Sequence, residues 1–235
     1  QFPRGGLSLR LSFSYNQKVE IKFIESIERD IQNWQNSVAA KSYGVEWKKF
    51  LPEDISIEDV RDSGRLKIYL EKNYYQNGEV SEFINWLENT TKPSEIQKDL
   101  TVLMDKKFIN HVKIFITTFH RAPDNVRENF FYLIWRDANR KRAITNIYHE
   151  LMHFLFHIYY WETCRRAGLS ETQIHTLKES ITVLLNPTLE KRGLPADNGY
   201  PAHQKLRVQL KKLWSGEKNF ELFLNKVLQL KIVAQ

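Results

Sequence analysis

The stretch NIYHELMHFLFH, residues 146–157, places three histidines and a glutamate inside a strongly apolar run. Helical spacing of the apolar residues predicts a long α-helix over 137–168, with one apolar face formed by Ile144, Ile147, Leu151, Leu155 and Ile158. Charged and imidazole groups on such a helix cost free energy unless neighbours or a metal ion pair with them. The rest of the chain must therefore supply either core partners or a metal site.

The sequence before this helix mixes strand and helix patterns. Alternating apolar residues predict strands at 7–13, 66–70 and 112–118, and the run NFFYLIWR at 129–136 predicts a further strand that is apolar on both faces. Helical spacing predicts helices at 24–38, 80–87 and 96–103. We expect an α+β fold whose strands form one mixed N-terminal sheet.

The sequence after Gly168 is predicted to be mainly helical. Ser170 and Gln173 have the spacing of a capping box and open a helix that Pro187 is expected to end. Proline and glycine then mark an irregular segment at 187–201, and two further helices close the chain, through 206–213 and 220–227. These elements predict a helical C-terminal lobe.

Cysteine content and hydropathy limit the possible compartments. Cys164 is the only cysteine in 235 residues, so the chain has no internal disulfide and no cysteine-based zinc site, which fits a reducing compartment. No apolar run reaches the roughly twenty residues that span a bilayer, and no secretory segment stands at the start. We expect a soluble, cytoplasmic protein without a membrane span, while secretion after removal of a signal stays open.

The net charge of +7 and the pI of about 9.3 raise the question of a nucleic-acid partner. The basic residues are scattered, with only short clusters at 140–142 and 211–212. A nucleic-acid surface usually carries a concentrated basic stripe with groups that read or stack on bases. The sequence therefore does not favour nucleic-acid binding as the main activity.

His149 and His153 stand four residues apart on the predicted helix, so their side chains project side by side and can bind one tetrahedral zinc ion. Glu150 is rotated by about 100° from His149, which makes it a poor third ligand but leaves it within reach of a water on the metal. Zinc lowers the pKa of such a water toward about 7, and a glutamate beside it can accept the proton. The pattern predicts a hydrolytic zinc site; core histidines without a metal are the alternative.

The third ligand is expected on the following helix. His157 lies one helical turn beyond His153, about 6 Å further along the axis, which is too far for the same ion. Glu179 stands in the interior of a predicted helix with apolar residues after it, where a buried carboxylate needs a strong partner. Glu171 is the rival, but it directly follows the cap Ser170, so helix capping and the helix dipole already explain it.

The motif NIYHELMHFL resembles the active-site helix of the zincin metallopeptidases, and a glutamate ligand on the next helix resembles the gluzincins among them. The resemblance covers mainly 112–186. It implies a Zn²⁺-dependent hydrolase of peptide or protein substrates, with Glu150 as general base and with His149, His153 and Glu179 as ligands. It also implies that the last strand of the sheet, 129–136, forms the upper edge of a cleft where extended substrate pairs by main-chain hydrogen bonds.

This resemblance divides the chain into an N-terminal α/β subdomain, 1–136, with the cleft-edge strand, and a helical subdomain, 137–235, which carries the motif helix. Together they are expected to form one catalytic unit. One position departs from the family, because many gluzincins have an aspartate four residues after the ligand glutamate, where this chain has Val183. Support for a ligand histidine is therefore expected from elsewhere, with Asn146 and Asn186 as candidates.

A hydrogen-bond donor from beyond Glu179 is expected to stabilise the oxyanion of the reaction. Tyr200 and His203 stand where the irregular segment enters a helix at Pro201, a position from which either side chain could overhang a cleft. Ordinary surface residues at a helix start are the alternative. The alternative for the whole protein is a non-catalytic zincin-like chain that uses the cleft or its basic surface to bind protein or nucleic acid. The sequence leaves the oligomeric state open.

Overall fold

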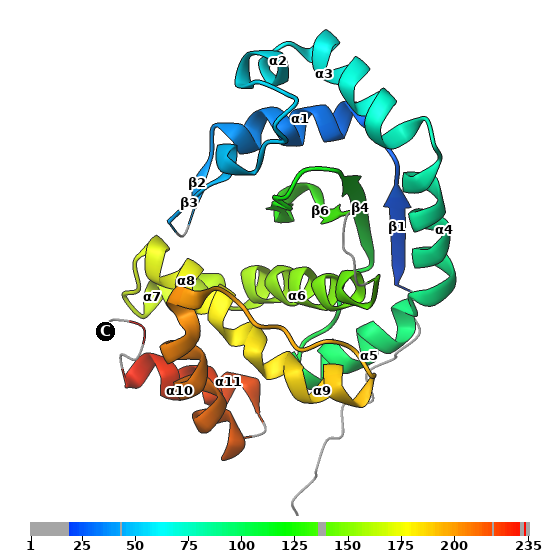
Figure 1. Cartoon of the computed structure of the whole chain (residues 1–235). Helices are drawn as coiled ribbons and strands as arrows, with labels where there is room; N and C mark the ends of the chain where they lie inside the picture. The colour runs from blue at the N-terminus through cyan, green and yellow to red at the C-terminus, as the bar shows by residue number, and fades with distance from the viewer. Residues whose placement is uncertain (1–18, 43, 136–139, 218, 231–232, 234–235) are drawn as a thin grey trace, which may run out of the picture.

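The computed structural model describes residues 19–42, 44–135, 140–217, 219–230 and 233. The chain is a mixed α+β fold with a small sheet among many helices, as predicted (Figure 1). The strand predicted at 7–13 lies outside these residues. None of the helices within them has the length and apolar character needed to cross a membrane.

The main sheet runs in the order β1, β4, β6, β5 over the described part of the chain. The strands are β1 (Glu20–Ile24), β4 (His111–Thr117), β5 (Asp124–Asn125) and β6 (Phe130–Ile134), while β2 (Lys41–Ser42) and β3 (Val45–Glu46) form a separate pair. Strands β1, β4 and β6 are parallel, and β5 is antiparallel to β6. The predictions of strands at 112–118 and 129–136 are confirmed in substance by β4 and β6.

The expected cleft-edge strand is wrong in one respect. Strand β6 lies between β4 and β5, so β5 forms the edge of the sheet on that side. The chain turns back just before β6, pairing Asp124 with Phe131 and Asn125 with Phe130, and the Tyr132 amide donates to the Pro123 carbonyl. A strand as short as β5 carries no readable alternation, which is why the sequence pattern did not reveal it.

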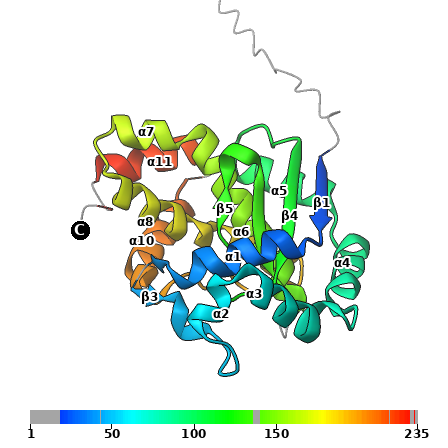
Figure 2. The same ribbon diagram turned by 90° about the horizontal axis from the view of Figure 1, so that it is seen from above.

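Helices cover both faces of the sheet. Helix α1 (Ile27–Val38) packs across one face against β4, and α6 (Arg140–Tyr159) lies along the other against β6 (Figures 1 and 2). The face toward α6 belongs to the large apolar cluster that includes Leu151, and on the opposite face Phe115, Phe130 and Tyr132 form a small cluster of their own. Both faces of β6 are therefore buried, as expected of a strand that is apolar throughout.

The other helices are arranged around these layers. Between β3 and β4 stand a 3₁₀ turn (Trp47–Phe50), α2 (Ile57–Arg61), α3 (Ser63–Leu70), a π-helical turn (Glu71–Tyr75), α4 (Glu79–Thr90) and α5 (Pro93–Met104). A 3₁₀ turn (Val126–Glu128) joins β5 to β6. After α6 come α7 (Trp161–Arg166), α8 (Glu171–Ile181), a 3₁₀ turn (Thr182–Leu185), α9 (Asn186–Lys191), a second such turn (Pro201–His203), α10 (Gln204–Ser215) and α11 (Phe220–Gln229). The helices predicted at 80–87, 96–103, 206–213 and 220–227 are confirmed by α4, α5, α10 and α11.

The strand predicted at 66–70 is wrong, because these residues belong to α3. Leu66 and Leu70 are fully buried while Ile68 is 67% exposed, which is the four-residue spacing of a helix rather than the two-residue spacing of a strand. The Asp62 carboxylate caps the helix by accepting from the Gly64 and Arg65 amides.

The helix predicted over 137–168 is two helices in the described residues. α6 ends at Tyr159 and α7 begins at Trp161, while Gly168, at φ +89°, ends the second helix as predicted. The capping box of Ser170 with Gln173 is confirmed. Pro187 does not end a helix; it stands in the first turn of α9, where a missing N–H costs nothing.

The cluster of apolar side chains beneath the sheet draws on the whole chain. It joins Ile114 of β4, Leu151 of α6 and Phe220 of α11, which lie on both sides of the boundary predicted at residue 136. This core fixes α6 between the sheet and the C-terminal helices. The division into two subdomains stays a prediction.

Candidate metal centre

Helices α6 and α8 bring two histidines and a glutamate together. The Nε2 atom of His149 lies 3.5 Å from Oε2 of Glu179, and the Nε2 atom of His153 lies 3.7 Å from the same oxygen. The two imidazole rings are 4.2 Å apart between centroids. Three atoms of ligand type from two packed helices therefore converge on one point.

The spacing of these atoms suits a small metal ion. Ligands about 2.0–2.1 Å from a tetrahedral zinc ion stand roughly 3.4 Å from one another, which is close to the distances between Glu179 and the two imidazoles. His149, Glu150 and His153 also form a group whose ligand atoms lie within 4.8 Å of one another. This cluster could hold a metal ion.

Glu150 and Glu179 contact opposite edges of His153. Oε2 of Glu150 lies 3.5 Å from Nδ1 of His153, whereas Glu179 faces the Nε2 atoms of both histidines. Because both Nε2 atoms face Glu179, this residue fits the place of the third ligand better than Glu150 does. Glu150 then lies beside these candidate ligands, with its side chain 16% exposed.

A buried atom of His153 supports the fit. His153 is 2% exposed, and its Nε2 atom has no hydrogen-bond partner within the part of the chain that the structure describes. Buried polar atoms are normally paired, so such an atom needs an explanation. A metal ion between His149, His153 and Glu179 would provide the missing partner.

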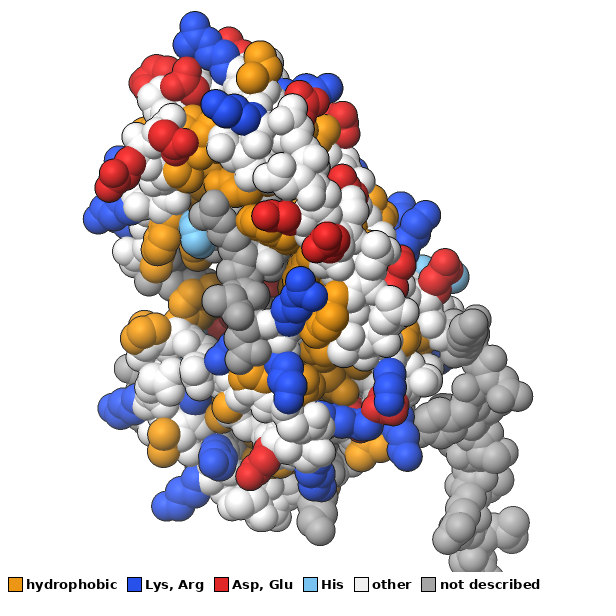
Figure 3. All heavy atoms as spheres, turned by 45° about the vertical axis from the view of Figure 1, so that its right-hand side comes forward, with side chains coloured by type: hydrophobic (Ala, Val, Ile, Leu, Met, Phe, Trp, Pro, Cys, Tyr) orange, Lys and Arg blue, Asp and Glu red, His pale blue; other side chains and the backbone are white. Residues whose placement is uncertain are grey.

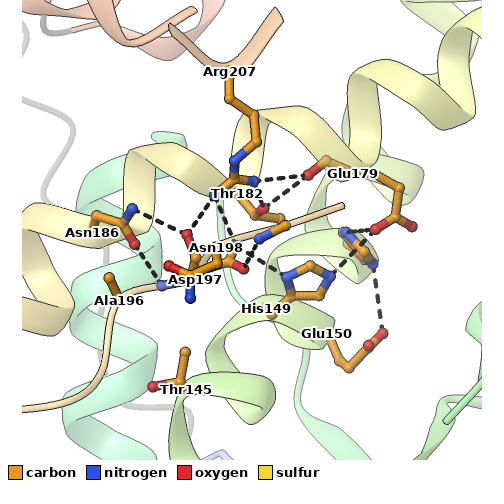
Figure 4. A network of polar contacts seen from close by, with 12 residues as sticks. Thr145, His149, Glu150, Glu179, Thr182, Asn186, Ala196, Asp197, Asn198 and Arg207 are labelled. Atoms are coloured by element: carbon orange, nitrogen blue, oxygen red, sulfur yellow. Dashed lines mark hydrogen bonds and ion pairs between the residues drawn. The ribbon is translucent and has the colours of Figure 1, made fainter. Parts of the chain in front are cut away.

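Asp197 holds the other edge of His149. Its Oδ2 atom lies 3.2 Å from Nδ1 of His149, which orients the ring with Nε2 toward Glu179 (Figure 4). Asn186 fixes Asp197 in turn, since its amide donates to the Asp197 carbonyl and its Oδ1 accepts from the Asp197 amide at 2.8 Å. Asn186, one of two asparagines expected to support the site, thus acts through Asp197, which the sequence did not reveal.

The electrostatics of the cluster favour a cation. Burial alone would lower the pKa of His149, but its contacts with Asp197 and Glu179 raise this pKa to about 10. Burial alone would raise the pKa values of Glu179 and Asp197, but the adjacent histidines hold both below their ordinary range. Carboxylates that stabilise an imidazolium here would equally stabilise a metal ion.

Three side chains of α6 hold the segment that carries Asp197. Arg142 donates to the Ala196 carbonyl at 2.6 Å, Thr145 donates to the Pro195 carbonyl at 2.9 Å, and His149 contacts Asp197 itself. Three positions on one face of α6 thus contact three consecutive residues, 195–197, of an irregular segment.

Arg207 of α10 fastens the same segment from the other side. This side chain is 2% exposed and donates to the Asp197 carbonyl at 2.5 Å, to the Glu179 carbonyl at 3.2 Å and to Oγ1 of Thr182 at 2.8 Å. It therefore ties the end of α8 to the loop that orients His149. Gly199 lies against it at φ +59°, where a Cβ atom would stand 2.6 Å from Nη1 of Arg207.

Lys178 lies on the far side of Glu179. Its Nζ atom is 3.6 Å from Oδ2 of Asp124 on β5 and 3.7 Å from Oε1 of Glu179. Burial alone would lower the pKa of Lys178, but these two carboxylates raise it above its ordinary value. The side chain is thus a buried ammonium group between the edge strand and the candidate ligand.

Glu171, the rival ligand, lies at the protein surface. Its side chain is 59% exposed and pairs with Arg165 at 2.8 Å. His157 lies one turn beyond His153, with its ring 4.8 Å from that of Trp161. The structure thus places both residues in contacts that do not involve a metal ion.

Tyr200 and His203 both lie close enough to Glu179 to interact with it electrostatically. Burial and then the carboxylates of Glu179 and Glu150 raise the pKa of Tyr200, so its hydroxyl stays protonated within electrostatic reach of both. His203 is 6% exposed, and its ring centroid is 5.6 Å from that of Tyr200. Burial lowers the pKa of His203, although Glu179 opposes this. Arg121, half-buried beyond β4, also acts on Tyr200 electrostatically and was not singled out from the sequence.

Comparisons of the chain with models of protein families, with curated proteins and with solved structures find no match. The resemblance to zincins therefore remains a hypothesis based on the motif. The structure itself shows a His–Glu–His cluster that could hold a metal ion.

Proposed function

We propose that this protein is a zinc-dependent metallopeptidase, and the convergence of His149, His153 and Glu179 is the observation that carries the proposal. Two imidazoles and one carboxylate are a common ligand set of catalytic zinc sites, which keep a fourth position open. Aspartate behind a ligand histidine, as with Asp197 and His149, is the usual outer partner in such sites.

The residues around the cluster have separate roles in this proposal. Bound zinc supplies a Lewis acid that acidifies water and polarises a carbonyl group. Glu150, beside the ligands, accepts a proton from the attacking water and returns it to the leaving amine. Tyr200 or His203 donates a hydrogen bond to the oxygen that becomes negatively charged.

An extended peptide fits the sheet edge beside this cluster. Strand β5 lies outermost on its side of the sheet within the described residues, so its outer main-chain groups can pair with another strand. Asp124 of β5 is linked through Lys178 to Glu179, which places the edge strand next to the candidate metal site. This arrangement supports a peptide substrate.

Positive charge does not support a nucleic-acid substrate. On the face drawn in Figure 3, acidic and basic side chains are mixed in the upper part and basic ones predominate in the lower part, where they stand scattered and do not form one continuous stripe. Peptide hydrolysis therefore stays the preferred activity.

The test combines metal content with turnover in matched variants. The purified chain should hold about one zinc ion, and Glu179→Ala should weaken zinc binding far more than Glu171→Ala, because only Glu179 faces the histidines. Glu150→Gln should keep the metal and lower the rate of peptide cleavage by about 10² or more, the usual scale for a lost acid–base group. Elemental analysis and cleavage of an unfolded-peptide mixture measure both effects.

Three results would contradict the proposal. Absence of zinc after reconstitution would remove the metal site, and equal zinc retention in the Glu179 and Glu171 variants would remove Glu179 as a ligand. Zinc binding without cleavage of any peptide would favour the non-catalytic alternative, in which the cleft only binds a partner.

A further inference from the structure

The two carboxylate oxygens of Glu179 contact different partners, and Lys178 is one of them. Oε2 of Glu179 faces the two histidine nitrogens, at 3.5 and 3.7 Å, while Oε1 faces the Lys178 ammonium at 3.7 Å. Lysine 178 is only 5% exposed, and its second partner, Asp124, comes from another element. A metal site made of His149, His153 and Glu179 requires neither the burial of Lys178 nor its contact with Asp124.

We infer that Lys178 is a positioning residue that keeps Glu179 a one-oxygen ligand of the metal. The inference rests on the proposed metal site. A carboxylate with both oxygens free can bind a metal ion through one oxygen or through both. An ammonium group beside Oε1 attracts that oxygen away from the ion, so only Oε2 is left to bind.

The number of oxygens bound has a chemical consequence. Zinc in a catalytic site usually has three protein ligands and one open position. A second oxygen from Glu179 would enter this limited coordination shell and compete with water for the open position. Lys178 therefore protects the position that the proposed reaction requires.

Asp124 explains why an ammonium group can remain at this place. A buried charge without a partner is strongly destabilising. If the charge of Glu179 is shared with a metal ion, Asp124 still provides a full negative charge 3.6 Å from Lys178. Through Lys178, the same contact links the edge strand β5 to the Glu179 side chain. It therefore fixes the position of the sheet edge relative to the proposed metal site.

A buried ion pair that merely stabilises the fold is the competing explanation. In that case the loss of Lys178 would lower the melting temperature without changing how Glu179 binds a metal. The two explanations differ in the coordination number of the bound ion, which can be measured without any turnover.

The experiment uses the full chain loaded with cobalt(II), whose visible absorption weakens when coordination rises from four to five. Lys178→Met should lower the absorption per bound cobalt by about twofold or more, because Glu179 can then bind through both oxygens. Lys178→Arg keeps a cation and should keep the spectrum of the parent. Lys92→Met removes an exposed lysine that also pairs with a glutamate and serves as the matched control.

A second variant keeps the experiment informative if Lys178→Met alone fails to fold. Lys178→Met alone leaves Asp124 buried without a cation, so the double variant Lys178→Met with Asp124→Asn removes both charges together. It should show the same weakened spectrum. Identical spectra in the parent, the single and the double variant would overturn the role of Lys178, whereas failure of the parent to bind cobalt or zinc would overturn the metal site itself.

Discussion

Asp197 fixes the orientation of the His149 ring. Its substitution should weaken metal binding while the fold is kept. Its carboxylate contacts Nδ1 of the ring at 3.2 Å, while its main-chain amide donates to Asn186 and its main-chain carbonyl accepts from Arg207. Asp197→Asn keeps the shape but removes the charge, so zinc affinity should fall about 10–100-fold, the usual effect of losing an outer partner. Competition with a chelating dye measures this affinity.

The control for that change is Asp99→Asn. Asp99 is also an aspartate with defined partners, since it accepts from Tyr148 and pairs with Arg192, but neither partner belongs to the metal cluster. Its variant should bind zinc as the parent does. Equal affinity of the Asp197 and Asp99 variants would show that Asp197 does not support the site.

Gly199 is the glycine where a side chain should be most harmful. Alanine there must adopt φ +59° and place Cβ 2.6 Å from Nη1 of Arg207, which is buried and already donates hydrogen bonds. Gly193 has a similar φ of +64° with nothing within 4 Å of its Cβ position. Gly193→Ala should therefore cost only the backbone strain, about 1–2 kcal/mol, and Gly199→Ala about 1–3 kcal/mol more through the displaced hydrogen bonds.

Urea denaturation of both alanine variants tests this difference. The free energy of unfolding should fall in both and fall further for Gly199→Ala. Equal losses would mean that Arg207 moves aside without cost.

The sequence could predict that two residues four apart on a helix lie side by side. It could not predict which partners contact them across loops. The spacing of His149 and His153 fixes their relative direction on α6, so the sequence revealed the pair before any fold was known. Asp197 reaches His149 from 48 residues away, through a segment without periodicity. Lys178 directly precedes Glu179, but its role depends on Asp124, which only the fold brings near.

At the scale of elements, Asp30 joins α1 to the end of β4. Its carboxylate is fully buried and accepts from the hydroxyl groups of Thr117 and Thr118 at 2.6 and 2.7 Å and from Tyr75. Burial is the largest effect and raises the pKa of Asp30 above its ordinary value of 3.8, although these hydrogen bonds oppose it. The junction therefore holds a carboxyl group that is harder to ionise than an ordinary aspartate.

The pH dependence of Asp30→Asn follows from this direction. A group whose pKa is raised on folding adds stability below its unfolded pKa, and this contribution is lost as pH rises through the folded pKa. The unfolding free energy of the parent minus that of Asp30→Asn should therefore decrease as pH rises above 3.8. Urea denaturation at a series of pH values measures this difference.

Asp59 provides a control with the opposite sign. Hydrogen bonds from Ser56 in the capping box of α2 lower the pKa of Asp59. The corresponding difference for Asp59→Asn should increase with pH. A difference for Asp30 that also increases with pH would show that folding lowers the pKa of this carboxyl group instead of raising it.

Elements with a long amphipathic pattern were predicted better than short ones. The helices α1, α4, α5, α10 and α11 show apolar spacing over several turns, and the structure contains each of them. Leu66, Ile68 and Leu70 offered only three positions, too few to separate a period of 2 from one of 3.6. Strand β1 was not predicted from the sequence, because Phe23 is the one buried residue among its five and leaves no clear alternation.

At the scale of the whole molecule, a bound ion should stabilise the fold as a ligand does. Zinc at about 100 times its dissociation constant adds roughly 2.7 kcal/mol to the unfolding free energy. For a chain of this size that corresponds to a rise in melting temperature of about 5–10 °C. Calorimetry with zinc, and again with excess chelator, measures the shift.

The double variant His149→Ala with His153→Ala is the control for the melting temperature. It should melt at the same temperature with and without zinc, because the ligands are gone. A zinc-dependent rise in that variant would show that the stabilising ion binds elsewhere on the chain.

The α+β class could be predicted, but the order of the strands could not. Local patterns identify strands and helices one at a time, whereas the order β1, β4, β6, β5 depends on pairings between distant residues. Asp124–Asn125 forms an edge strand only because β6 is already in place beside it. The packing of α8 on α6 likewise decides where the candidate ligand Glu179 lies relative to the two histidines.

The parallel pairing of β1 with β4 has a consequence for synthesis on the ribosome. Glu20 is paired with His111, which follows it by 91 residues. Ribosomes add roughly 5–20 residues per second, so β1 emerges roughly 5–20 s before the strand that completes it. During that interval Val19 and Phe23, both buried in the finished protein, are exposed on the nascent chain. We expect the growing polypeptide to be a client of holdase chaperones until β4 has been translated.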